Sequence, residues 1–154
     1  MQRWLNLALG ISMLACALHS AAQKQDHGYW QAASSNAASI TGDITISDAK
    51  LTINFKGFPI AFIRDLKPAE VSAIFDADSN TANPGTLYRL KIPAEQRFVR
   101  KNTLCGELDT QWMAAYVAGK TLNVAFFSGE EAPVFTFDAI THSPNICGTF
   151  TYVR

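Results

Sequence analysis

The sequence predicts a mainly β protein, a single antiparallel barrel or sandwich of about eight strands with one short helix. Three observations support this fold class. Apolar and polar residues alternate over short segments, turn-forming residues separate these segments, and only one segment has the pattern of a helix start. No internal repeat, low-complexity tract or linker divides the chain, so we expect one domain over residues 23–154.

The alternating segments are the predicted strands. Residues 40–47 and 51–56 flank a tight turn and predict a hairpin. The strands predicted further along the chain cover residues 86–92, 111–117, 121–128, 133–137 and 148–153. Weaker patterns indicate structure from Gly28 to Trp30, a short strand after Pro59 and an edge strand around Phe98 and Val99. Residues 23–27 are predicted to be a frayed start, and residues 76–85 and 138–145 are predicted to be loops.

One segment predicts a helix over Pro68–Phe75. Pro68 suits the first helical position, and the negative charge of Glu70 in the first turn interacts favourably with the helix dipole. Leu66 and Val71 are spaced to form a hydrophobic staple. A strand over residues 71–76 is the alternative.

The N-terminus has the pattern of a cleaved export signal. Arg3 precedes an apolar run over residues 5–18, and Ser20 and Ala22 are small residues where a signal peptidase cleaves. The apolar run is shorter than the roughly 20 residues that a membrane-spanning helix needs. We therefore predict a signal peptide over residues 1–22 and a periplasmic or secreted protein of a Gram-negative cell, with no transmembrane segment after cleavage.

Cys16 raises the alternative of a lipoprotein. A lipidation site prefers Leu three residues before the cysteine, but Met13 occupies that position and Leu14 follows it. We therefore do not expect an anchor at Cys16. Cleavage after Ala22 leaves Cys105 and Cys147, which we expect to form a disulfide in an oxidising compartment. Two free buried thiols are the alternative.

The composition argues against some function classes. The 13 basic side chains balance the 13 acidic ones, whereas general nucleic-acid binding needs a basic surface. Residues 76–80 resemble the start of a calcium loop, but Thr81 replaces the glycine of that motif. The sequence indicates no metal site and no cofactor.

No catalytic constellation is evident either, so we predict that the protein is not an enzyme. His27 and His142 have no spacing typical of a metal site or a nucleophile–base pair, and we expect both to be exposed. Acidic residues flank the predicted turns and are interpreted as solvated, although two of them at a barrel mouth would suit glycosidase chemistry. These residues are Glu107, Asp109, Glu130, Glu131 and Asp138.

Two groups of residues are candidate binding sites. Trp112, Tyr116 and Phe126 belong to strands that are apolar on both faces, which indicates either core packing under the helix or a ligand-lined interior. The second group is basic and suits either an anionic partner or a solvated edge strand. It consists of Arg89, Lys91, Arg97, Arg100 and Lys101.

Several short motifs carry a resemblance to known proteins. The segments GYW, LYRLKIPA, NTLCG, TQWM, AFFSG and CGTFTYVR together resemble a family of small exported bacterial proteins of unknown function. That family implies no activity. Gly28 and Trp30 also form a G-x-W start similar to that of lipocalin and avidin-like barrels. Bacterial lysozyme-inhibitor barrels are similar in size, export signal and disulfide.

The functional hypothesis from sequence is a non-catalytic periplasmic or secreted binding protein. Its ligand would be a small apolar molecule held near Trp112, Tyr116 and Phe126. The alternative is an inhibitor or immunity-type protein that acts on an envelope or secreted enzyme through Arg89, Arg97 and Arg100.

Overall fold

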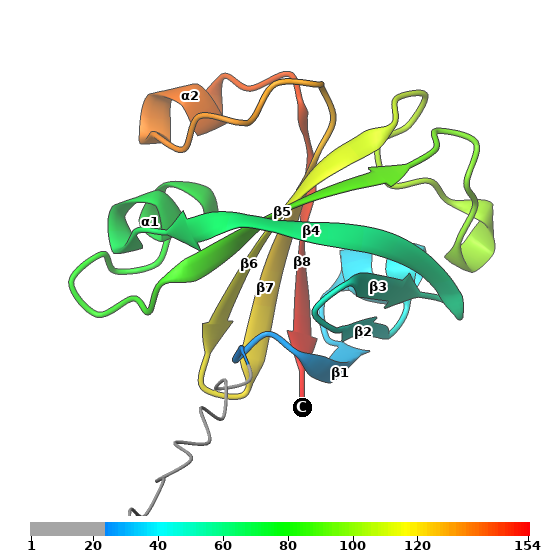
Figure 1. Ribbon diagram of the computed structural model, residues 1–154, viewed down its shortest axis with the longest axis horizontal. Helices are drawn as coiled ribbons and strands as arrows, with labels where there is room; N and C mark the ends of the chain where they lie inside the picture. The colour runs from blue at the N-terminus through cyan, green and yellow to red at the C-terminus, as the bar shows by residue number, and fades with distance from the viewer. Residues whose placement is uncertain (1–23) are drawn as a thin grey trace, which may run out of the picture.

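Eight antiparallel strands close into a barrel in which each strand pairs with its neighbours in the sequence and the first pairs with the last (Figure 1). A computed structural model describes residues 24–154, so the predicted export signal and Cys16 lie outside the described residues. The strands are β1 (Gly28–Ala32), β2 (Ile44–Ile46), β3 (Lys50–Ile53), β4 (Lys56–Leu66), β5 (Gly85–Ile92), β6 (Thr110–Ala118), β7 (Thr121–Phe127) and β8 (Ile146–Val153). The predicted fold class is confirmed, and of the two predicted architectures the protein has the barrel.

Within residues 24–154, four short helical segments lie between the strands. They are the π-helix η1 (Ala37–Thr41), the α-helices α1 (Pro68–Phe75) and α2 (Phe137–Thr141), and the 3-10 helix η2 (Val99–Lys101). None of the helices in residues 24–154 is both long and apolar enough to span a membrane.

The barrel interior is filled by side chains from every strand. Trp30, Tyr88 and Phe126 are among its largest fully buried members. The hydroxyl groups of Thr41 and Tyr152 lie 2.7 Å apart in this interior, so one donates a hydrogen bond to the other. The interior is therefore a packed core, as expected for a barrel of eight strands.

A second apolar cluster lies outside the barrel wall, over β6 and β7. Residues of these two strands alternate between the clusters, with Met113 inside and Trp112 outside, for example. Helix α1 covers the outer face, and Phe75 stacks on Tyr116 with ring centroids 6.0 Å apart. Strands that are apolar on both faces therefore have both faces covered by this chain.

A bulge in β4 lets one strand serve both clusters. Phe62 pairs with Tyr88 on β5, and the register then shifts before Arg64 pairs with Leu87. Beyond this bulge, Leu66 belongs to the outer cluster, whereas Ile60 before it belongs to the interior. The bulge is thus the point where β4 turns its apolar residues from the barrel to α1.

Helix α1 has the predicted bounds and the predicted start. Both carboxylate oxygens of Glu70 accept hydrogen bonds of 2.8 Å from the Arg64 guanidinium, and one also accepts from the Lys67 backbone N–H at 2.9 Å. These donors, the Arg64 side chain first, hold the pKa of Glu70 below its usual value. The helix ends at Asp76, whose left-handed φ of 56° breaks the helical backbone.

The strand predicted for residues 40–47 is wrong over its first half. Residues Ala37–Thr41 form η1, and only Ile44–Ile46 pair as a strand. The Thr41 hydroxyl donates to the Ala37 carbonyl at 3.2 Å, and Gly42 then takes a φ of 63° that a strand does not allow. Burial of Ala37 and Thr41 in the barrel therefore outweighs the alternating pattern around Ile40.

Two further predicted strands do not form. Residues 133–136 run as loop, and Phe135 packs edge-on against Phe127 at 5.7 Å between ring centroids. Thr136 then caps α2 by accepting a 3.2 Å hydrogen bond from the Ala139 N–H, so the loop predicted for residues 138–145 contains a helical turn. The edge strand predicted around Phe98 and Val99 is η2 instead.

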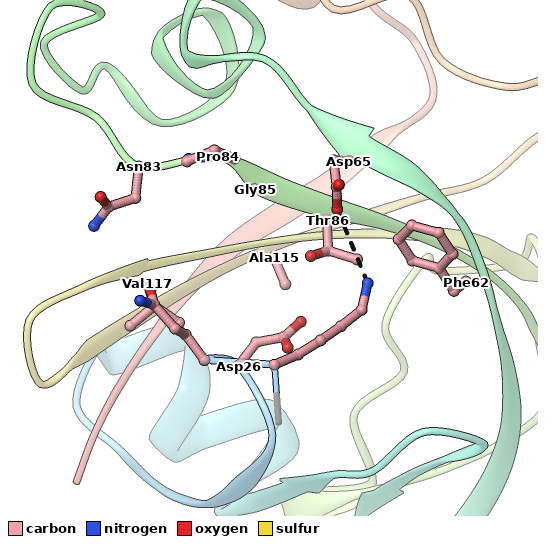
Figure 2. Close-up of a pocket in the computed structure, with 11 residues that line it drawn as sticks. Asp26, Phe62, Asp65, Asn83, Pro84, Gly85, Thr86, Ala115 and Val117 are labelled. Atoms are coloured by element: carbon pink, nitrogen blue, oxygen red, sulfur yellow. Dashed lines mark ion pairs between the residues drawn. The ribbon is translucent and has the colours of Figure 1, made fainter. Parts of the chain in front are cut away.

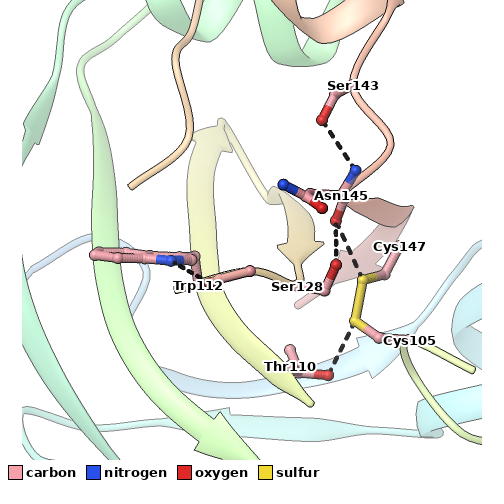
Figure 3. The surroundings of a disulfide bond; sticks show 8 residues. Cys105, Thr110, Trp112, Ser128, Ser143, Asn145 and Cys147 are labelled. Carbon is pink, nitrogen blue, oxygen red and sulfur yellow. Dashed lines mark hydrogen bonds between the residues drawn. A yellow bond between two sulfur atoms is a disulfide. The ribbon is translucent and has the colours of Figure 1, made fainter. Parts of the chain in front are cut away.

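The predicted disulfide joins Cys105 to Cys147, whose Cα atoms are 4.9 Å apart (Figure 3). Cys105 lies in the loop between β5 and β6, and Cys147 is the second residue of β8. The crosslink therefore ties a long loop to a strand that is two strands away from β6 in the barrel order.

We expect the double substitution Cys105→Ala and Cys147→Ala to lower the free energy of unfolding by about 3–4 kcal/mol, because the unfolded chain regains the entropy of the open loop. Denaturant unfolding with and without reductant measures this loss. Reductant should destabilise the wild type and leave the double variant unchanged.

Non-reducing peptide mapping should recover the linked peptides that contain Cys105 and Cys147. Native protein with two alkylatable thiols would contradict the predicted disulfide.

Candidate functional site

A cavity of about 530 Å³ opens at the barrel end where the described chain begins (Figure 2). Its walls come from strands β4, β5 and β6, from the end of the loop between α1 and β5, and from the segment that leads into β1. We call it the N-terminal cup. Its lining residues are Lys24, Gln25, Asp26, Phe62, Asp65, Asn83, Pro84, Gly85, Thr86, Ala115 and Val117.

Asp26 places a buried carboxylate in the wall of the cup. Only 4% of the residue is exposed, and its carboxylate points into the space beside Thr86, Ala115 and Val117 (Figure 2). The Tyr88 hydroxyl donates a 2.7 Å hydrogen bond to Oδ2, whereas Oδ1 has no partner among the described residues. Oδ1 itself has almost no exposed surface, and a buried carboxylate oxygen without a donor is costly.

Tyr88 is the donor that holds Asp26. Burial in the barrel interior and then the nearby Asp26 charge raise the pKa of Tyr88 far above its ordinary value. The phenol therefore stays protonated across the physiological range and keeps its proton for Oδ2.

His27 follows Asp26 and is also buried, with 6% exposure. Its Nε2 lies 3.8 Å from Asp26 Oδ1 and has no hydrogen-bond partner in the described chain, and its Nδ1 lies 3.5 Å from Asp48 Oδ1. The predictions of a frayed start over residues 23–27 and of an exposed His27 are therefore wrong for Asp26 and His27. His142, in contrast, is exposed beside Asp138.

The position of the segment before β1 depends on contacts between the two ends of the described chain, near β1 and β8. The Trp30 indole donates to the Asp26 carbonyl at 2.8 Å. The Arg154 guanidinium lies 4.3 Å from the Trp30 ring and donates to the His27 carbonyl at 3.1 Å. The contact with Arg154, far along the chain, thus helps to order the polar segment before β1. No local sequence pattern reveals this contact.

Lys24 extends its ammonium group into the cup. Its Nζ lies 3.3 Å from the centroid of the Phe62 ring and 6.0 Å from that of Tyr88, which is the geometry of a cation–π contact. The same nitrogen lies 3.9 Å from Asp65 Oδ1 (Figure 2). The cup therefore already holds one cationic group, supplied by the chain itself.

The aromatic residues predicted to line one ligand site are not brought together. Phe126 is in the barrel interior, whereas Trp112 and Tyr116 are in the outer cluster under α1. The Trp112 indole donates to the Gly129 carbonyl at 3.0 Å, so its polar edge is also used in the fold.

The predicted basic group is divided as well. Arg89 lies over the Trp112 ring at 4.5 Å and donates to the Gln111 amide oxygen at 2.6 Å. Arg97 and Arg100 are exposed in the loop between β5 and β6, where the Arg97 carbonyl accepts a 3.3 Å hydrogen bond from Lys56 Nζ.

Three of the predicted turn carboxylates surround a second cavity of about 470 Å³. These are Glu107, Asp109 and Glu130, which line the cavity together with Ser128 and Asn145. Ser128 and Asn145 lie close to the disulfide (Figure 3). Asp109 accepts a 2.9 Å hydrogen bond from the Ala94 N–H and lies 3.7 Å from Lys91 Nζ, so it is used in the loop structure. Residues 24–154 contain no group of three or more His, Cys, Asp or Glu that would hold a metal ion.

The fold and the cup define a disulfide-bonded, eight-stranded antiparallel barrel with a packed interior and an open cavity at one end. Comparison of the chain with protein-family models, curated proteins and solved structures found no match.

We expect Tyr88→Phe to destabilise the protein by about 1–3 kcal/mol, because it leaves the buried Asp26 carboxylate without its hydrogen-bond donor. Tyr29→Phe is the matched control, since the Tyr29 hydroxyl also donates to a carboxylate, that of Asp43, but at an exposed position. Thermal and denaturant unfolding of both variants measure the difference. Equal losses in the two variants would contradict a special role for the Tyr88–Asp26 pair.

Proposed function

We propose that the protein is a non-catalytic binding protein that holds a small amphipathic molecule in the N-terminal cup. The observation that carries this proposal is the cup itself, an open cavity whose wall contains the buried carboxylate of Asp26. The cavity volume falls within the range of about 300–1,000 Å³ that is typical of small-molecule sites.

The lining divides into an apolar and a polar part, which supports an amphipathic ligand. Phe62, Ala115 and Val117 offer an apolar wall, whereas Asp26 and Thr86 offer polar groups close to it. Side chains already fill the barrel interior around Phe126, which favours the cup over the interior as the ligand site.

Binding rather than catalysis is supported by how the polar groups are engaged. Tyr88 holds one oxygen of Asp26, and a tyrosine with a strongly raised pKa is a poor proton donor for chemistry near neutral pH. His27 contacts Asp26 but is not among the lining residues of the cup. The disulfide and the predicted export signal support a periplasmic or secreted location.

We expect native mass spectrometry of protein released from the periplasm to detect a bound small molecule. Thr86→Phe should remove this added mass, because the new ring fills the cup from β5. Thr149→Phe is the control, since it makes the same change at an exposed position on β8. An added mass that Thr86→Phe retains would contradict binding in the cup.

One observation favours the inhibitor alternative as a second candidate. Arg100 and Lys101 both have left-handed backbone angles, with φ of 52° and 61°, in the exposed turn η2. Such a conformation is strained for long side chains and persists only where the surroundings hold it. Here the Phe98 N–H donates to the Asn102 carbonyl at 2.9 Å, and the Asn102 amide donates to the Ser39 carbonyl at 2.8 Å. A loop held in this way presents its cations in a fixed geometry that suits an acidic cleft.

If this candidate is correct, the double substitution Arg97→Glu and Arg100→Glu should abolish capture of an envelope or secreted enzyme in a pull-down assay, because like charges replace the attraction. The control is Lys50→Glu with Lys120→Glu, which changes the net charge equally at exposed sites by the β2–β3 and β6–β7 turns. Equal capture by the two double variants would contradict recognition through the loop.

A further inference from the structure

We infer that the N-terminal cup is selective for a primary alkylammonium ion, a free alkylamine in its protonated form, and that Lys24 competes with this ligand from within the chain. The inference rests on the proposed function and names the chemical class of its ligand.

The first argument is the position of the Lys24 ammonium group. Nζ is 3.3 Å from the face of the Phe62 ring and 3.9 Å from a carboxylate oxygen of Asp65. A cation gains from both contacts, because an aromatic face and a carboxylate each present negative potential. Lys24 thus marks the place in the cup where an ammonium group of a ligand would sit.

The second argument is the buried carboxylate of Asp26, whose charge adds negative potential to the wall of the cup. Oδ1 is buried and has no donor among the described residues, and Tyr88 already occupies Oδ2. His27 Nε2 lies 3.8 Å from Oδ1, beyond hydrogen-bond distance. A primary ammonium at the Lys24 position carries a positive charge that the Asp26 charge attracts, and its N–H groups can donate to Asp65. A quaternary ammonium has no donor, and a neutral alcohol has no charge.

The third argument concerns the rest of the ligand. Beside the polar groups, the cup is walled by Phe62, Pro84, Ala115 and Val117. These four residues provide no hydrogen-bonding side chain. They therefore suit the unbranched alkyl chain of a free amine better than a lysine residue of another protein, which brings a polar backbone with it. Because Lys24 occupies the cation position, a ligand amine must displace it before binding.

Isothermal titration calorimetry at neutral pH with n-hexylamine hydrochloride and 1-hexanol tests the inference, since the two probes share a chain length and differ in charge. We expect hexylammonium to bind wild type about tenfold more tightly than hexanol. Asp26→Asn should remove this preference. Lys24→Met should tighten hexylammonium binding more than hexanol binding, because it removes the internal competitor.

Phe62→Leu keeps the inference testable if Asp26→Asn fails to fold. Phe62 is about half exposed, so the variant retains the fold while it removes the aromatic face. It should weaken hexylammonium binding several-fold and leave hexanol binding nearly unchanged. Phe55→Leu, at the fully exposed turn between β3 and β4, is the matched control and should change neither.

Other outcomes would overturn the inference. Equal affinity for hexylammonium and hexanol would overturn the selectivity for cations and leave the cup as a ligand site. Tighter binding of Nα-acetyl-lysine-N-methylamide than of hexylammonium would assign the site to lysine side chains instead of free amines. If neither probe binds but a bound mass sensitive to Thr86→Phe is detected, the selectivity for alkylammonium is overturned and the proposed function stands. If neither probe binds and no such mass is detected, the proposed function is overturned as well.

Discussion

Closure of the barrel between its first and last strands is the constraint on which the rest of the structure depends. β1 and β8 pair at only two positions in register, Gln31 with Val153 and Ala32 with Tyr152. The closure is reinforced by side chains, because Arg154 stacks on the fully buried Trp30 and donates to the backbone just before β1. These contacts hold the entering segment against the end of the barrel, so the same interaction that closes the fold also forms one wall of the cup.

The abundant aromatic residues are explained by packing. Strands β6 and β7 carry large apolar residues on both faces because one face fills the barrel and the other receives α1 and Phe135. The β4 bulge makes this arrangement possible, since it redirects Leu66 to the outer cluster while Phe62 remains at the cup. The distinctive aromatic side chains are thus largely structural, whereas the buried carboxylate of Asp26 lies at the barrel end.

The cup combines a buried carboxylate, an aromatic ring and an ammonium group of the chain itself. A buried carboxylate normally has its full set of donors, yet Asp26 receives a hydrogen bond from Tyr88 on one oxygen and none from residues 24–154 on the other. Lys24 brings a cation to the aromatic face of Phe62 without filling that vacancy by a hydrogen bond to Asp26. A cationic ligand would take the place of Lys24 at the ring, so its affinity would depend on the exchange of one ammonium group for another.

The sequence by itself determined the fold class, the helix Pro68–Phe75 and the cysteine pair, because these follow from short-range periodicity, helix-start residues and counting. It predicted that β6 and β7 are apolar on both faces, but only tertiary structure decided that Phe126 lies inside and Trp112 outside. The failed strand over residues 40–43 and the missed site at Asp26 and His27 have one physical reason. Their conformations depend on partners more than 60 residues away, such as Tyr88, Tyr152 and Arg154, and no local pattern encodes such contacts.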